Sequence, residues 1–178
     1  MADKDEDTPY EQLCRAVRDY GEAAMENLLR CRAFGRAVME GLPGWLGVSA
    51  SCVSAVPAKG PFDPAKDYGD GAFSFDPDKV IRLEPITFGV CVIVPNAEDS
   101  GSLWLRTGVR LEITGSTFDV FVANQPLLRV PLEFEGELDP VFETIHRELM
   151  AVFRMELAAY NDERYKGGIG FMPQRPGF

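Results

Sequence analysis

The stretch 103–122, LWLRTGVRLEITGSTFDVFV, decides the fold of this chain. On each side of its TGST tetrapeptide (114–117), apolar and polar side chains alternate with a period of two. That alternation is typical of a strand with one buried face, and a Gly-Ser pair between two such runs is typical of a tight turn. The stretch therefore predicts a β-hairpin, whose short connection requires antiparallel strands.

The hairpin has a definite register if Gly115 and Ser116 form its turn. The cross-strand pairs are then Thr114 with Thr117, Glu112 with Asp119, and Arg110 with Phe121. Aligning the inward-facing residues of the next strand, 128–134, places Arg129 opposite Phe121. Pro131 cannot donate a ladder hydrogen bond, so we expect that strand at an edge of the sheet.

Upstream segments extend this sheet. Residues 45–56 alternate as a half-buried strand, and residues 86–94 are apolar on both sides, as in a central strand. Between them, residues 57–79 are rich in proline, glycine and aspartate and predict a long loop, with a short strand near 73–75. Loops of this length are either functional or disordered.

Two amphipathic helices flank the strands. Thr8, Pro9 and Glu11 form a capping box, after which apolar residues recur every three or four positions to Glu40, where Gly41, Pro43 and Gly44 stop the pattern. The stripe of the first helix is Leu13, Val17, Tyr20, Ala24, Leu28, Cys31, Phe34 and Val38. The second helix begins at an Asp139 N-cap and ends at Gly167-Gly168.

The predicted fold is therefore α+β, an antiparallel sheet of five or six strands covered on one face by long N-terminal and C-terminal helices. A strongly bent sheet wrapped around one helix is the alternative. We expect a single domain over residues 8–166. A disordered acidic segment, 1–7, would precede this domain, and a Gly/Pro-rich tail, 167–178, would follow it.

Composition excludes several classes of partner. The chain of 178 residues has the apolar and charged fractions of a soluble globular protein, and its net charge is −10. Nucleic acid and anionic membranes would meet a like-signed field, so we expect neither as a partner. No secretory signal begins the sequence, and its four cysteines show no CxxC spacing. These features predict a cytoplasmic protein with reduced thiols.

Patterns for metal, cofactor or catalytic sites are weak. The one histidine, His146, stands in a Glu-x-x-His sequence but has no second such pair, and we interpret it as structural. The loop aspartates do not match a calcium loop, and the Gly167-Gly168 cluster follows a helix, where it cannot cradle phosphate. We predict no metal, no cofactor and no catalytic residue.

The outer face of the predicted sheet is the most specific candidate site. It carries Arg110, Phe121 and Arg129 in one row, with Trp104 and Arg106 further along. Arginines beside aromatic rings bind carboxylates, phosphates or an acidic segment of a partner, although a solvated sheet face has the same composition. Cys91 emerges on this side near Arg106, whose charge would lower the pKa of the thiol and make it reactive.

Two functions from different classes fit this surface. The first is a non-catalytic protein-interaction module, homodimeric, that uses the arginine and aromatic outer face together with the tail aromatics Phe171 and Phe178. The alternative is a small-molecule binder or enzyme, with a pocket under the 57–79 loop where the arginines hold an anionic ligand.

Overall fold

The computed structural model describes residues 7–74, 82–95, 101–158 and 169–173; for residues 155–158 and 169–173 it describes the backbone alone. The expected disorder of the acidic N-terminal segment (residues 1–6), part of the long loop, the end of the second helix and Phe178 lie outside these ranges. The two helices are α1 (Pro9–Leu46) and α2 (Asp139–Ala158). The strands are β1 (Val53–Val56), β2 (Ile86–Pro95), β3 (Gly101–Thr114), β4 (Thr117–Val122), β5 (Leu128–Pro131) and β6 (Ile169–Pro173).

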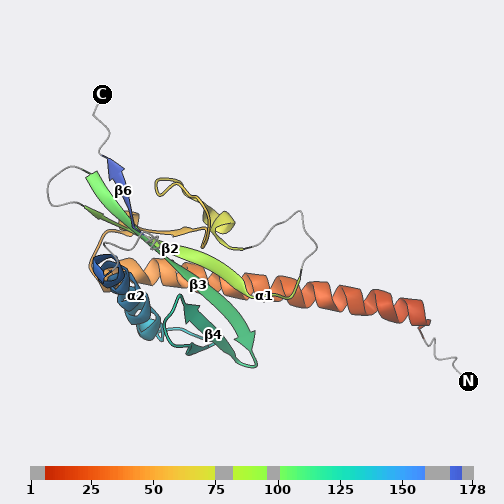
Figure 1. The fold of residues 1–178 in the computed structure, drawn as a ribbon. Helices are drawn as coiled ribbons and strands as arrows, with labels where there is room; N and C mark the ends of the chain where they lie inside the picture. Colours follow the sequence, from red (N-terminus) through yellow and green to blue (C-terminus); the bar gives the residue numbers. More distant parts are fainter. Residues whose placement is uncertain (1–6, 75–81, 96–100, 159–168, 174–178) are drawn as a thin grey trace, which may run out of the picture.

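These strands form one antiparallel sheet with the order β1-β2-β3-β4-β5. The long strand β3 pairs with β2 along one side and, on the other, with β6 through Gly101–Leu105 and with β4 through Val109–Thr114. Both helices pack on the sheet, and the predicted α+β class is confirmed (Figure 1). Strand β6 was not expected, because GIGFMP shows no alternation.

The hairpin β3–β4 has the predicted register, with Thr114 opposite Thr117 and Arg110 opposite Phe121. Gly115 stands at φ 61°, a left-handed conformation that glycine adopts without steric cost. Phe118, Val120 and Val122 are buried, as the alternation predicts. The turn chemistry and the one-sided burial therefore specify the same pairing.

Helix α1 continues six residues beyond its predicted end at Glu40. Pro43 lacks an amide hydrogen and so loses one helical bond, but Leu42 and Pro43 are buried. Gly41 lies against Phe142, where a Cβ atom would come within 2.6 Å of the ring. Packing thus overrides local propensity, and the helix ends instead at Gly47, with φ 73°.

The predicted strand 45–56 is correspondingly wrong over most of its length. Residues 45 and 46 belong to α1, Ala50–Cys52 form a short 3-10 turn named η1, and only Val53–Val56 pair with β2. Near 73–75 a 3-10 turn named η2 (Gly69–Ala72) precedes Ser74, whose amide donates to the Thr87 carbonyl. In the described part of the chain, this one backbone hydrogen bond is all that is found of the expected short strand.

The core lies between α1, α2 and the inner face of the sheet. Phe34 of α1 packs against Phe118 of β4, with ring centroids 4.7 Å apart. Gly35, the next residue, lets the ring of Phe73 approach so closely that a Cβ atom would lie 2.5 Å from it. Helix α2 contributes Val141, Ile145 and Leu149 to the same cluster. These contacts hold the C-terminal part of α1 on the sheet.

We predict that Gly35→Ala lowers the free energy of unfolding by about 1–3 kcal/mol, because the added methyl group must displace the Phe73 ring. Denaturant titration at low protein concentration measures the change. Gly44→Ala is the control: nothing lies within 4 Å of its Cβ position, so it should be neutral or stabilising by up to about 1 kcal/mol. Equal effects of the two substitutions would contradict this account of Gly35.

Candidate functional site

Arg110 and Phe121 meet on the outer face of the sheet as predicted. The Arg110 guanidinium lies 4.1 Å from the centre of the Phe121 ring, on the neighbouring strand. Its Nη1 also lies 2.7 Å from Oε1 of Glu112. The cation is therefore already stacked on an aromatic ring and neutralised by a carboxylate of the same chain.

Arg129 does not lie opposite Phe121, so this part of the predicted row is wrong. It pairs with Asp119, and its Nε lies 3.3 Å from Oδ1 of that carboxylate. Asp119 is buried, and its Oδ2 accepts a hydrogen bond of 3.2 Å from Thr114. A two-residue shift between β4 and β5 keeps every side chain on its own face, so apolar alternation cannot detect it.

Arg106 and Trp104 hold down the segment that follows β1. Nη1 of Arg106 donates to the carbonyl oxygens of Pro57, at 3.2 Å, and Gly60, at 2.8 Å. Its guanidinium lies 4.4 Å from the Phe62 ring, which in turn meets the Trp104 ring edge-on at 4.8 Å. Burial lowers the pKa of Arg106. Both predicted site residues thus anchor the start of the 57–79 loop on the outer face.

Cys91 is the cross-strand partner of Arg106, as the sequence suggested, but its thiol is not activated. The side chain is fully buried, and this burial raises the pKa of Cys91 to about 11. The neighbouring Ser54 side chain and the charge of Arg106 oppose the shift without overcoming it. The thiol therefore behaves as a small core side chain.

The loop then crosses the β1 edge and is anchored a second time on α1. Oδ1 of Asp70 lies 2.5 Å from Nη2 of Arg36, and Oδ2 lies 3.7 Å from Arg32. The hydrogen bond from Arg36 is the main cause that lowers the pKa of Asp70. Phe73 follows and packs on Phe88, with ring centroids 5.0 Å apart. Residues 57–74 are thus fixed to both faces of the sheet.

A cavity of about 600 Å³ lies where the alternative hypothesis placed one, between α1, β1 and residues 64–70. The outer-face arginines do not line it. Of its cations, Arg36 is bound to Asp70 and Lys66 stands 4.9 Å above the Tyr68 ring. Glu40 and Asp67 add negative charge to the lining. This lining does not suit an anionic ligand.

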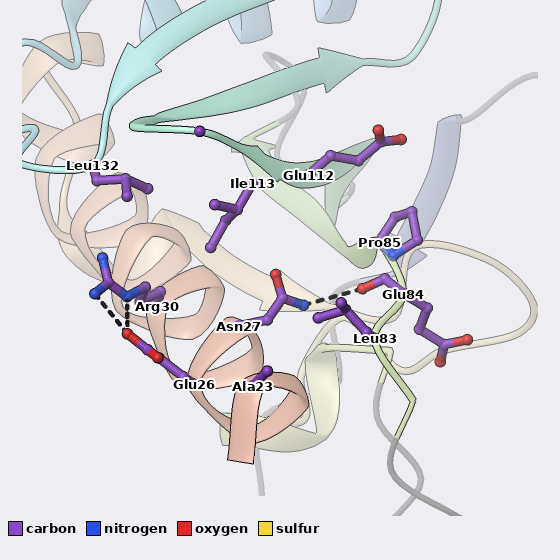
Figure 2. Close-up of a pocket in the computed structure, with 11 residues that line it drawn as sticks. Ala23, Glu26, Asn27, Arg30, Leu83, Glu84, Pro85, Glu112, Ile113 and Leu132 are labelled. Atoms are coloured by element: carbon purple, nitrogen blue, oxygen red, sulfur yellow. Dashed lines mark hydrogen bonds and ion pairs between the residues drawn. The ribbon is translucent and has the colours of Figure 1, made fainter. Parts of the chain in front are cut away.

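A second groove, of about 510 Å³, runs beside α1 between Ala23 and Arg30 (Figure 2). Its other wall combines the end of the β3–β4 hairpin and Leu132 with the segment Leu83–Pro85, where the Glu84 carbonyl accepts a hydrogen bond of 3.1 Å from Asn27. Arg30, one of its charged residues, is bound to Glu26 at 2.6 Å. The groove thus lies at the point where α1 leaves the body of the protein.

The first half of α1 projects from the sheet (Figure 1) and carries an exposed apolar stripe. The exposed fractions are 75% for Tyr10, 65% for Leu13, 73% for Val17 and 48% for Tyr20. The same helical face becomes buried from Ala24 onward, through Leu28, Cys31 and Phe34. We call Tyr10, Leu13, Val17 and Tyr20 the projecting stripe.

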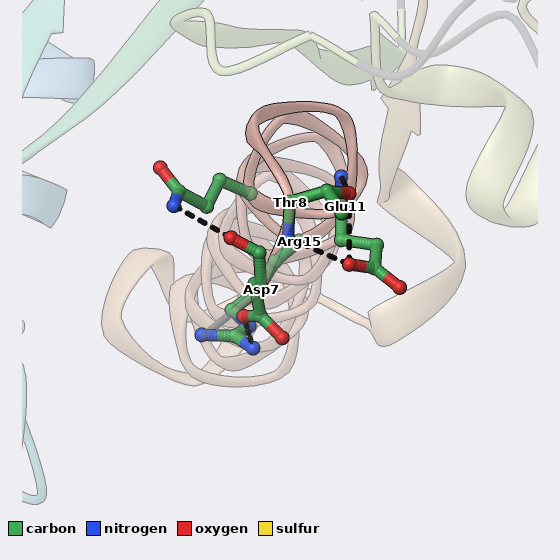
Figure 3. A network of polar contacts seen from close by, with 5 residues as sticks. Asp7, Thr8, Glu11 and Arg15 are labelled. Atoms are coloured by element: carbon green, nitrogen blue, oxygen red, sulfur yellow. Dashed lines mark hydrogen bonds and ion pairs between the residues drawn. The ribbon is translucent and has the colours of Figure 1, made fainter. Parts of the chain in front are cut away.

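Polar contacts hold the free end of this helix (Figure 3). The Thr8 side chain accepts from the Glu11 amide, and Glu11 accepts from the Thr8 amide at 2.7 Å, which confirms the capping box. Arg15 forms an ion pair with Asp7. The sequence placed the stripe in the core, because periodicity does not reveal where a sheet ends. The length of the predicted helix could have indicated that part of it projects. A helix of 20 residues already spans about 30 Å, the diameter of a small domain, and the predicted helix is longer.

Other candidates carry no site. His146 is exposed, with its ring 5.8 Å from that of Trp45. Buried Glu148 accepts a hydrogen bond of 2.8 Å from Gln125 and so anchors the β4–β5 connection. Within the described ranges, no three His, Cys, Asp or Glu side chains gather as metal ligands would. Phe171 and Met172 lie on β6, where only the backbone is described.

The fold and these surfaces define an α+β protein with one projecting helix. Comparison with protein-family models, curated proteins and solved structures finds no match. In the described part of the chain, no helix combines the length and apolar character needed to cross a bilayer.

We predict that Arg129→Ala lowers the free energy of unfolding by about 1–3 kcal/mol, because it leaves the buried Asp119 carboxylate without its cation. Arg110→Ala removes only exposed contacts and should cost less than about 1 kcal/mol. Denaturant titration of both variants measures the two losses in the free energy of unfolding. A larger loss for Arg110→Ala would refute the assignment.

Thiol reactivity should follow exposure. Cys14 is exposed, whereas burial raises the pKa of Cys91 to about 11 and that of Cys31 to about 12. At neutral pH we expect a maleimide pulse to label Cys14 first and to label Cys31 and Cys91 only on unfolding. Mass spectrometry of the digested protein locates the label. Labelling of Cys91 as fast as Cys14 would contradict its burial.

Proposed function

We propose that this chain is a non-catalytic protein-interaction module that forms a homodimer through the projecting half of α1. The projecting stripe carries the proposal. Four large apolar or aromatic side chains stand exposed on one helical face, and the continuation of that face is the core. Contiguous exposed apolar surface on a folded chain is typical of an interaction site.

The energetics favour association over exposure. Fully burying a Leu or Val side chain contributes on the order of 1.5 kcal/mol or more. Two copies bring four Leu or Val side chains and four Tyr side chains together, which offsets an association cost of at least about 4 kcal/mol. The contact area of one short helix pair is small, so we expect a dimer of micromolar affinity.

Charge explains why a second copy suits this surface. The net charge of −10 makes two copies repel each other wherever their bodies approach. The first half of α1 projects from the sheet, and the stripe on it contains no charged residue, so two copies can meet there at the lowest electrostatic cost. A contact through the sheet would bring the two acidic bodies together instead.

The arginine and aromatic outer face supports the proposal less well than the sequence suggested. Arg106, Arg110 and Arg129 each bind carbonyl or carboxylate oxygens of their own chain. A partner would have to break these contacts before it gained new ones. In the projecting stripe only the Tyr20 hydroxyl is engaged by the described residues, where it accepts a hydrogen bond of 2.9 Å from the Leu83 amide. A partner that covers Tyr10, Leu13 and Val17 requires no such exchange.

We predict that Val17→Glu abolishes dimer formation, because a carboxylate would then be buried at the centre of the interface. The monomer should keep its stability, since Val17 is exposed and Glu has the higher helix propensity. Sedimentation velocity from about 1 µM to about 1 mM spans the expected dissociation constants.

Arg15→Gln is the matched control for this substitution. It makes the same change in charge on the opposite face of the same helix, and it removes only an exposed ion pair with Asp7. This variant should dimerise like the unaltered chain. A chain that stays monomeric throughout, or a dimer that survives Val17→Glu, would overturn the proposal.

A further inference from the structure

Small side chains flank the projecting stripe on both sides. At 100° per residue, Cys14 and Gly21 lie along one side of the stripe and Ala16 and Ala23 along the other. Small flanking residues let a second helix approach closely, while the large residues of the stripe supply the knobs that fill the space between them. This face therefore has the shape of a helix-pairing surface.

Among the residues that the structure describes, none gives a packing reason for Gly21. Gly35 and Gly41 of the same helix make room for Phe73 and Phe142, but nothing lies within 4 Å of a Cβ atom at Gly21. A glycine inside a helix costs about 1 kcal/mol relative to alanine. A contact from outside the chain would account for that cost.

The direction of pairing follows from the position of the sheet. The sheet covers the same face of α1 from Ala24 onward. A parallel second helix laid on the stripe would run into that sheet as it continued. An antiparallel second helix runs away from the sheet of the first copy. The sheet of the second copy then lies beyond the N-terminal end of the first helix, and the two acidic sheet domains stay apart.

Resting on the homodimer proposed above, we infer that the two α1 helices pair antiparallel about a twofold axis that crosses them at the level of Cys14 and Arg15. In this arrangement Tyr10 of each copy packs over Gly21 of the other, in a hole bordered by Val17 and Tyr20. Leu13 of each copy lies against Val17 of the other.

Substitution at Gly21 tests this register. Gly21→Leu fills the hole meant for Tyr10 of the second copy, so we expect dimerisation to weaken by about tenfold or more in sedimentation experiments. The monomer should be equally or more stable, because the site is open and leucine favours a helix. Gly44→Leu, at another open position of α1, is the control and should leave the dimer intact.

The exposed Cys14 supplies a second readout. It lies beside the proposed axis, so a short bismaleimide should link Cys14 of the two copies, and Val17→Glu should abolish the link. A dimer that Val17→Glu dissociates, but that tolerates Gly21→Leu and gives no Cys14 link, would overturn the antiparallel register alone. A chain that never dimerises would overturn the proposed function itself.

Discussion

The packing of Phe34 and Gly35 against the sheet determines the shape of the whole molecule. Phe34 meets Phe118 and Phe134, at 4.7 and 5.2 Å between ring centroids, while Gly35 admits the Phe73 ring. Together they fix one point of a 38-residue helix on the core. Because a helix is stiff, this anchor also sets where its first half points, and Phe73 ties the 57–74 segment to the same place.

The sequence was sufficient wherever local chemistry and burial agreed. The turn at Gly115 and the alternation around it predicted the β3–β4 register, and the capping box predicted the start of α1 at Pro9. Prediction failed where tertiary contacts override local preference. Contacts with Phe142 carry α1 past Gly41, and only pairing with β3 makes residues 169–173 a strand.

The candidate site was harder to predict than the fold, for a physical reason. Composition placed arginines and aromatic rings on one face, but it could not show that the carbonyls of Pro57 and Gly60 occupy Arg106. The register between β4 and β5 differs by two residues from the predicted one, so Arg129 pairs with Asp119 while it stays on the outer face of the sheet. Conversely, an apolar stripe has the same periodicity whether a sheet covers it or ends before it.

The projecting half of α1 lacks the tertiary packing that holds most protein helices in place. A segment of its length is marginally helical in water, and it persists because the anchored half serves as a nucleus and Thr8 closes the far end. Its amides should therefore exchange with solvent along a gradient, slowest near Ala24 and fastest near Pro9. The extent of the apolar face available to a partner is then set by a helix–coil equilibrium, so temperature and the Thr8 cap tune association without altering any contact residue.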